Sequence, residues 1–153
     1  MVARDGDGWI ECNCGGKHWG KHGAAGLLVI RDGKVLMQHR AEWVHNGNTW
    51  GIPGGARDSH ESALEAALRE AHEETGIEDK FLKALGSHRD DHGTWSYETI
   101  VVCASEELVA VPTNDESLEL RWVPSNEVVG LNLHPSFAKT WPALQKLLIE
   151  LFG

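Results

Sequence analysis

The chain has 153 residues, 41% of them apolar, which is enough for one folded domain with a hydrophobic core. Its 24% of charged residues is close to the globular average and argues against disorder. The formal net charge of −9 repels polyphosphate at long range, so a nucleic-acid partner is not expected. Carboxylates that hold divalent cations would still let such a protein act on phosphates, because the ions dominate the local charge.

The sequence predicts neither a membrane span nor a signal peptide. No stretch reaches the length of a membrane span, and Asp5 and Asp7 stand where a signal peptide is basic. Three cysteines are too few to indicate a disulfide framework. We therefore expect a cytoplasmic protein without a membrane partner.

The first predicted elements follow a Gly-rich segment, residues 1–22, that we expect to be irregular. One domain is expected over residues 23–153, beginning with strands at residues 23–30 and 34–40. Between these strands, Arg31-Asp32-Gly33 predicts a tight hairpin turn, because Asp-Gly supplies the positive φ that such turns need.

The middle of the chain predicts a sharp turn and then a helix. Pro and paired glycines in TWGIPGG mark the turn. Ser59 is the predicted helix N-cap, and the helix should run to Thr75 and end at Gly76. Strands at residues 82–89, 97–104 and 118–123 and an amphipathic helix at 137–151 complete an α/β fold with a mixed sheet.

The predicted helix carries three carboxylates on one face. In helical projection, Glu70, Glu73 and Glu74 lie within about 100° of one another. Like charges at these spacings oppose helix stability, whereas hard cations such as Mg²⁺ require clustered oxygen ligands. Small alanines beside the carboxylates are expected to leave room for a ligand, and Arg69 is expected to orient Glu65 and Glu73.

A solvated glutamate-rich face would explain three carboxylates alone, but more of the segment follows a pattern. A glycine precedes a glutamate by six positions, and R-E-x-x-E-E-x-G and an aliphatic residue follow. The segment resembles the Nudix box of the Nudix hydrolase family, in its MutT-like branch, and only Ala71 is smaller than the residue common there. The matching residues are Gly55, Glu61, Arg69, Glu70, Glu73, Glu74, Gly76 and Ile77.

The resemblance implies an α/β/α sandwich around a mixed sheet and Mg²⁺-dependent hydrolysis, with Mn²⁺ as a possible substitute, of a nucleoside diphosphate linked to another group. Glu70, Glu73, Glu74 and the Gly55 carbonyl would be the metal ligands. The implied catalytic residues are Glu70, Glu73 and Arg69, with Glu61 supporting them. The general base could also lie later in the chain, at Glu98, Glu116 or Glu119, and Glu119 is preferred.

The substrate-binding candidates lie mainly around the loop that leads to the box. Trp43 and Trp50 could stack a nucleobase, whereas Trp122 and Trp141 are assigned to core packing. Arg40 and Gly54 are further substrate-binding candidates. The expected substrate is a small nucleotide, with an ordinary or modified nucleoside triphosphate preferred and pyrophosphate as product. ADP-ribose or nucleotide-sugar hydrolysis and a non-catalytic nucleotide sensor stay open as alternatives.

Two further hypotheses concern zinc and oligomeric state. Cys12 and Cys14, with His18 and His22 at four-residue steps, resemble a small zinc site. The C-x-C spacing is tighter than usual, so an ordered flap or solvated residues are favoured over structural Zn²⁺. Many members of the family are dimers, so the resemblance also makes a homodimer an open expectation.

Overall fold

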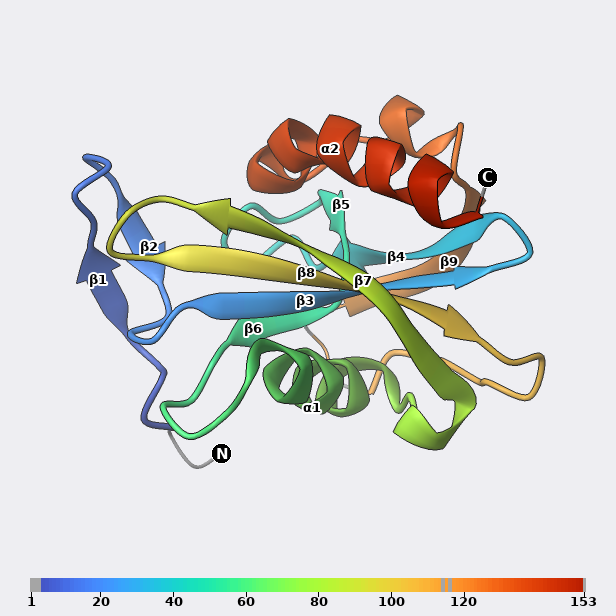
Figure 1. Cartoon of the computed structure of the whole chain (residues 1–153), viewed down its shortest axis with the longest axis horizontal. Helices are drawn as coiled ribbons and strands as arrows, with labels where there is room; N and C mark the ends of the chain where they lie inside the picture. The colour runs from blue at the N-terminus through green and yellow to red at the C-terminus, as the bar shows by residue number, and fades with distance from the viewer. Residues whose placement is uncertain (1–3, 114, 116, 153) are drawn as a thin grey trace.

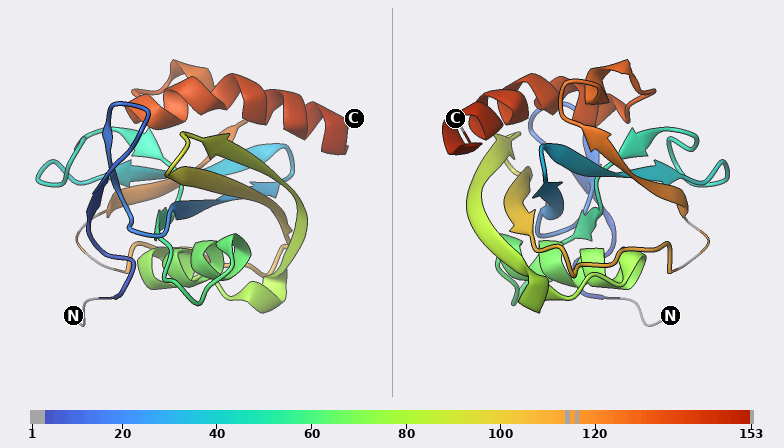
Figure 2. Two further views of the ribbon diagram at one scale, coloured as in Figure 1. Left: turned by 60° about the vertical axis from the view of Figure 1, so that its left-hand side comes forward. Right: turned by 90° about the vertical axis from the view of Figure 1, so that its right-hand side faces the viewer.

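The computed structural model describes residues 4–113, 115 and 117–152. A mixed seven-stranded sheet lies between two helices, α1 (Ala63–Thr75) on one side and α2 (Pro135–Phe152) on the other (Figure 1). The turned views in Figure 2 show the same three layers from two other sides. The predicted α/β/α sandwich is confirmed.

The sheet has the strand order β5-β4-β3-β8-β7, with β6 paired to β3 and β9 paired to β4. The pairing of β3 with β8 is parallel and the other pairings in this sheet are antiparallel, which makes the sheet mixed. The strands are β3 (Ala24–Arg31), β4 (Lys34–Arg40), β5 (Trp50–Gly51), β6 (Gly54–Ala56), β7 (Leu82–Asp91), β8 (Ser96–Ala104) and β9 (Ser117–Pro124).

Two hydrophobic cores form because alternate residues of each strand face opposite sides of the sheet. On β3, Leu27 and Val29 pack with the α1 core, whereas Leu28 and Ile30 pack with the α2 core. Trp141 is 1% exposed inside the α2 core, so its assignment to core packing is confirmed. Trp122 packs partly buried against the α1 core.

The predicted hairpin turn is confirmed. Arg31 pairs with Lys34, and Asp32 and Gly33 between them both have positive φ, 52° and 73°. A two-residue turn of this kind matches the twist of the two strands that it joins.

The two ends of α1 differ in how well the sequence predicted them. Gly76 ends the helix in the left-handed conformation, φ 72°, as predicted. The N-cap is Ser62, and the prediction of Ser59 was wrong. Ser62 accepts the Glu65 N–H, while the Glu65 side chain accepts the Ser62 N–H, a reciprocal capping box that Ser59 lacks. Ser59 instead donates to Asp5 in the N-terminal segment.

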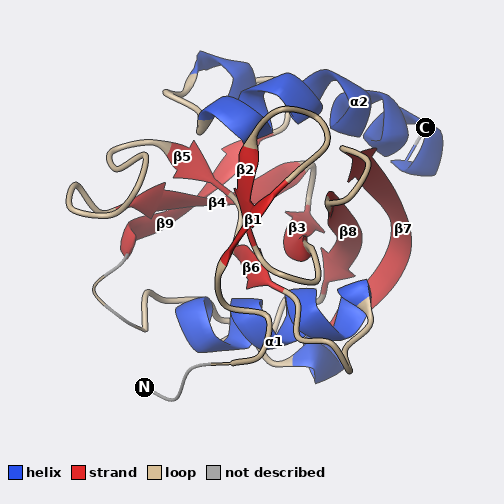
Figure 3. Ribbon diagram, turned by 90° about the vertical axis from the view of Figure 1, so that its left-hand side faces the viewer, coloured by secondary structure: helices blue, strands red, loops and turns tan. Residues whose placement is uncertain are grey.

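The N-terminal segment contains regular structure, so the prediction of an irregular segment was wrong there. Strands β1 (Trp9–Glu11) and β2 (Lys17–Trp19) form a separate antiparallel hairpin. Figure 3 shows this hairpin crossing in front of one end of the main sheet, between the levels of α1 and α2. Within the described residues, neither helix is long and apolar enough to span a membrane.

Candidate active site

The loop before α1 is held to the helix by one largely buried ion pair. The Arg69 guanidinium donates to both carboxylate oxygens of Glu61, at 2.7 and 2.8 Å, and to the Ala56 carbonyl at 3.1 Å. Glu61 also accepts the Asp58 N–H at 2.9 Å. Hydrogen bonds from Arg69 outweigh the opposing effect of burial and lower the pKa of Glu61 to about 2. Glu61 is therefore a carboxylate at any ordinary pH.

Glu70 lies directly against the backbone of β6, the strand before this loop, at Gly55. A Cβ atom at Gly55 would stand 2.6 Å from the Glu70 carboxyl carbon, so only glycine leaves space for that carboxyl group. Arg69 donates to Glu70 at 2.9 Å. Burial raises the pKa of Glu70 above its ordinary value, although hydrogen bonds with Glu74 and Arg69 act in the opposite direction. The Glu70 carboxyl group thus lies against the backbone of β6 in a poorly hydrated position.

The other two carboxylates are held by different partners. Glu74 accepts a hydrogen bond at 3.0 Å from Gln38, a residue of β4 that is 4% exposed and also donates to Ser117. Glu73 is more exposed and binds Arg4 at 2.8 Å and Arg69 at 3.5 Å. The three carboxylates therefore lie on the side of α1 that faces strands β6 and β4.

Two expectations about this helix are corrected by these contacts. The fork of Arg69 binds Glu61, not Glu65, because Glu65 is engaged in the capping box. Ala66 and Ala67 are fully buried against the sheet and leave no room for a ligand. Their small size instead brings α1 close to the sheet, which places the carboxylates beside β4 and β6.

The donor set fits a hard divalent cation. Glu70, Glu73 and Glu74 offer carboxylate oxygens, and the backbone of Gly55 is in contact with the first of them. Mg²⁺ prefers such oxygen donors and usually keeps several waters. Arg4 and Arg69 balance part of the negative charge of the cluster. The three glutamates and the Gly55 carbonyl are the ligands that we propose.

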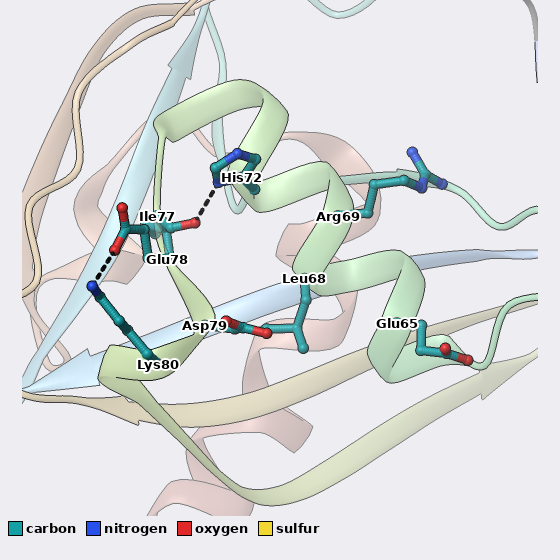
Figure 4. A pocket seen from close by; sticks show the side chains of 8 residues that line it. All are labelled: Glu65, Leu68, Arg69, His72, Ile77, Glu78, Asp79 and Lys80. Carbon is teal, nitrogen blue, oxygen red and sulfur yellow. Dashed lines mark hydrogen bonds and ion pairs between the residues drawn. The ribbon is translucent and has the colours of Figure 1, made fainter.

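A hollow on the outer side of α1 is a separate feature. Figure 4 shows its lining side chains, with His72 bonded to the Ile77 carbonyl and Lys80 bonded to Glu78. Its lining includes Arg69 but none of the three carboxylates of the site. The lining residues are Glu65, Leu68, Arg69, His72, Ile77, Glu78, Asp79 and Lys80.

Glu119 is not brought to the carboxylates, and the preference for it as general base is corrected. Its neighbours Leu120 and Trp122 pack on the α1 side of the sheet, whereas Val123 packs on the α2 side. Alternation therefore points Glu119 toward the α2 side, where it pairs with Arg121 at 3.1 Å. Glu98 instead lines a hollow with Arg57 and Ala63 beside the start of α1. The third candidate, Glu116, lies outside the described residues.

The substrate-binding candidates differ in how exposed their side chains are in the structure. Trp50 is 7% exposed, stacks on His39 at 4.5 Å and lies under the Arg121 guanidinium, so its prediction as a base-stacking residue was wrong. Trp43 is 65% exposed in the loop after β4, where a base could reach it. In the same loop region, Arg40 donates to the His45 carbonyl at 2.8 Å.

Gly54 has a structural reason to be glycine. A Cβ atom there would stand 2.5 Å from the Ala25 carbonyl oxygen, so the close approach of β6 to β3 excludes any side chain. The hydroxyl of Tyr97 also packs over this contact, and burial raises the pKa of Tyr97. Sequence reasoning missed Gln38, which binds Glu74, and the buried Asp58, whose carboxylate accepts the Gly6 N–H at 3.1 Å and a hydrogen bond from Arg4 at 3.3 Å. Buried polar residues of this kind carry no local pattern, because their partners are distant in the chain.

Comparison with known proteins identifies the family. The model of the NUDIX domain matches residues 20–147, most of the chain. The chain belongs to the Nudix hydrolase family. The relatives place the chain in the MutT-like branch of these enzymes.

Individual Nudix relatives are similar over nearly all of this chain. A protein of Mycobacterium tuberculosis named putative 8-oxo-dGTP diphosphatase 3 is 48% identical over 95% of this chain and 71% of its own length. A fusion protein of Bifidobacterium longum, a nucleoside triphosphate pyrophosphatase joined to a Nudix hydrolase, is 43% identical over 98% of this chain. The chain spans only 33% of that fusion protein. The crystal structure of RenU, a Nudix hydrolase of M. smegmatis, superposes with a TM-score of 0.85 at 43% identity, covering 95% of this chain and 97% of RenU.

Proposed function

We propose that this Nudix enzyme hydrolyses a nucleoside triphosphate, with an ordinary or oxidised base, to the monophosphate and pyrophosphate. The observation that carries the proposal is the placement of Glu70 against Gly55, with Glu73 and Glu74 beside it on α1. The similar M. tuberculosis protein is named for action on 8-oxo-dGTP, and a more distant E. coli relative is named CTP pyrophosphohydrolase. Both names describe enzymes that act on triphosphates.

The ligands of the site would be Glu70, Glu73, Glu74 and the Gly55 carbonyl, and Mg²⁺ is the proposed ion. When bound, Mg²⁺ neutralises charge on the diphosphate oxygens and lowers the pKa of a coordinated water. The chain's own contribution is to hold the ligand oxygens of the glutamates in position before substrate arrives. Gly55 admits the Glu70 carboxyl group, and Gln38 fixes one oxygen of Glu74.

Arg69 has a positioning role in this proposal. Its fork fixes Glu61 and the Ala56 carbonyl, and its remaining nitrogen contacts Glu70 and Glu73. Strand β6, which carries Gly55, and the loop after it are thereby held to the helix that carries the carboxylates. Trp43 is the proposed base-stacking residue, because it is the exposed aromatic side chain of the loop after β4.

The experiment is a substrate panel with product analysis. Purified protein with Mg²⁺ would be incubated with ordinary and oxidised nucleoside triphosphates, ADP-ribose, dinucleoside polyphosphates and nucleotide sugars. We expect the highest kcat/KM with a triphosphate, and pyrophosphate with no orthophosphate as the product. A preference for ADP-ribose or a nucleotide sugar would replace the proposed substrate. Binding without turnover of any nucleotide, with Mg²⁺ or Mn²⁺, would favour the sensor function.

A variant adds a test of the base-stacking residue. Trp43→Ala should raise KM for the preferred nucleotide while kcat stays close to the wild-type value, because stacking is lost equally in ground and transition states. The matched control is Phe152→Ala, another exposed aromatic residue, at the end of α2. An unchanged KM in Trp43→Ala would remove Trp43 from the substrate site.

A further inference from the structure

The turn of the N-terminal hairpin gathers two thiols and an imidazole. Cys12 and Cys14 lie in the turn between β1 and β2, and His18 lies in β2. The sulfur atoms and a ring nitrogen of these residues all lie within 4.8 Å of one another, and Cys14 Sγ stands 3.2 Å from His18 Nε2. One hairpin supplies all three side chains, so this cluster does not depend on contacts between distant elements.

The backbone of the turn has a defined, hydrogen-bonded conformation. The Cys12 N–H donates to the Gly16 carbonyl at 2.9 Å, and the Gly15 N–H donates to the Cys12 carbonyl at 3.0 Å. Gly15 has φ 94°, a conformation that L side chains rarely adopt. The Cys14 N–H donates to Cys12 Sγ at 3.5 Å, which holds that sulfur atom against the backbone of the turn.

The turn is also docked onto the main sheet, at the connection between β7 and β8. Asn13 exchanges hydrogen bonds with Thr94, at 3.1 and 3.3 Å, and Cys12 Sγ contacts the His92 carbonyl at 3.1 Å. The His18 ring stacks on Trp95 with centroids 4.1 Å apart. These contacts hold the His18 imidazole and dock the turn from outside the hairpin, while Cys12 would exchange its hydrogen bond to the His92 carbonyl for a bond to the ion.

The donor types select the ion. Two sulfur donors and one imidazole suit Zn²⁺ and disfavour Mg²⁺ and Ca²⁺, which require oxygen. A tetrahedral zinc ion with bonds of about 2.3 Å to sulfur and about 2.0 Å to nitrogen separates its ligand atoms by about 3.5 to 3.8 Å. The printed separation of Cys14 Sγ from His18 Nε2, 3.2 Å, is a little shorter than this range, and all three ligand atoms lie within 4.8 Å of one another.

We propose that Cys12, Cys14 and His18 form a zinc site that fastens the N-terminal hairpin to the turn between β7 and β8. The His92 ring lies 4.7 Å from that of His18 but outside the cluster of three, so His92 would have to change its side-chain rotamer to take the fourth position. The role of the ion is structural and separate from the carboxylates of α1. The site does not depend on which nucleotide the enzyme cleaves.

The proposal departs from the expectation drawn from the spacing of the cysteines. The C-x-C spacing argued against zinc, but the turn places both sulfur atoms on one side of the hairpin. His22, the other histidine of the sequence pattern, is not in the cluster, and its carbonyl instead accepts a hydrogen bond from Arg57. The second imidazole of the proposed site would be that of His92, whose ring lies 4.7 Å from that of His18.

The test is metal analysis of the full-length protein, purified without an affinity tag and in excess Mg²⁺ to exclude zinc from the carboxylates. We expect one equivalent of zinc in the wild type and its loss in Cys14→Ser and His18→Asn. Cys103→Ser is the matched control, because the third cysteine lies on β8 outside the cluster, and it should keep its zinc. His92→Gln should release zinc to a chelator faster than the wild type.

Two more readouts distinguish a zinc site from a disulfide at the same two cysteines. Replacement of zinc by Co²⁺ should give the visible absorption of a tetrahedral ion and sulfur-to-metal charge-transfer bands, and Cys14→Ser should lose the latter. Chelator should lower Tm of the wild type and leave Tm of Cys14→Ser unchanged. Zinc-free wild type with full activity and three titratable thiols would overturn the proposal. Fewer than three thiols, restored by a reductant, would replace it with a disulfide between Cys12 and Cys14.

Discussion

The buried pair of Glu61 and Arg69 makes a quantitative prediction about stability. Glu61→Gln should lower the free energy of unfolding near neutral pH by about 3 kcal/mol. The pKa of Glu61 falls from 4.5 to about 2 in the folded protein, mainly through hydrogen bonds from Arg69. Each unit of pKa corresponds to about 1.4 kcal/mol, and glutamine mimics the neutral acid. Removal of one partner of a buried pair generally costs about 3 to 5 kcal/mol, which agrees.

The pH dependence of the same variant has a defined sign. A carboxylate whose folded pKa is lowered stabilises the protein above its unfolded pKa and loses that contribution as pH falls through the folded value. Wild-type stability should therefore decline between pH 4.5 and about 2 more steeply than that of Glu61→Gln. Urea denaturation at several pH values, followed by tryptophan fluorescence, measures both curves.

The control for this experiment is Glu150→Gln, a change to an exposed glutamate of α2. Its unfolding free energy should stay within about 0.5 kcal/mol of the wild type at every pH. If the unfolding free energy of Glu61→Gln matched that of this control at neutral and at low pH, the ion pair of Arg69 and Glu61 would not be the contact that holds the loop after β6 to α1.

Three further changes test other parts of the structure. Gly55→Ala should lower kcat/KM with little loss of Tm, because the new Cβ would displace the Glu70 carboxyl group, and unchanged kinetics would contradict that contact. Ser62→Ala should cost about 1 kcal/mol in a denaturation experiment, and a loss in Ser59→Ala equal to it would contradict the observed capping box. Burial lowers the pKa of His134 from 6.5 to about 4, so protonation favours the unfolded state and stability should fall as pH drops through this window. His134→Gln should flatten that decline, and an unaltered slope would show that His134 does not cause it.

Local patterns predicted most of the fold because the elements depend on residues close in the chain. The Asp32-Gly33 turn, the glycine after α1 and the alternating strands all follow from backbone conformation and burial. The N-cap could have been predicted correctly from the local sequence, since Ser62 and Glu65 have the spacing of a capping box. The short hairpin β1–β2 was missed because its strands have three residues each and carry no clear alternation.

The site was harder to predict where it depends on contacts between distant elements. The resemblance to the Nudix box assigned Glu61, Arg69 and Glu70 to the site. That Arg69 binds Glu61 depends on the path of the loop before α1, which the sequence does not show. Glu119 was misplaced because the side of the sheet that a strand residue faces depends on its register with β4. The burial of Trp50 results from packing under α2 and Arg121, and the helical projection could not show that Ala66 and Ala67 face the sheet.

The most direct test of the central claim is the rate of pyrophosphate release by two glutamate variants. With Mg²⁺ and the preferred triphosphate, Glu70→Gln should lose about 100-fold or more of kcat, because Glu70 supplies a carboxylate at the reaction centre. Glu119→Gln should retain wild-type kcat, since that side chain faces the α2 side and pairs with Arg121 there. Equal activity of Glu70→Gln and the wild type, or a comparable loss in Glu119→Gln, would contradict the assignment of catalysis to the carboxylates of α1.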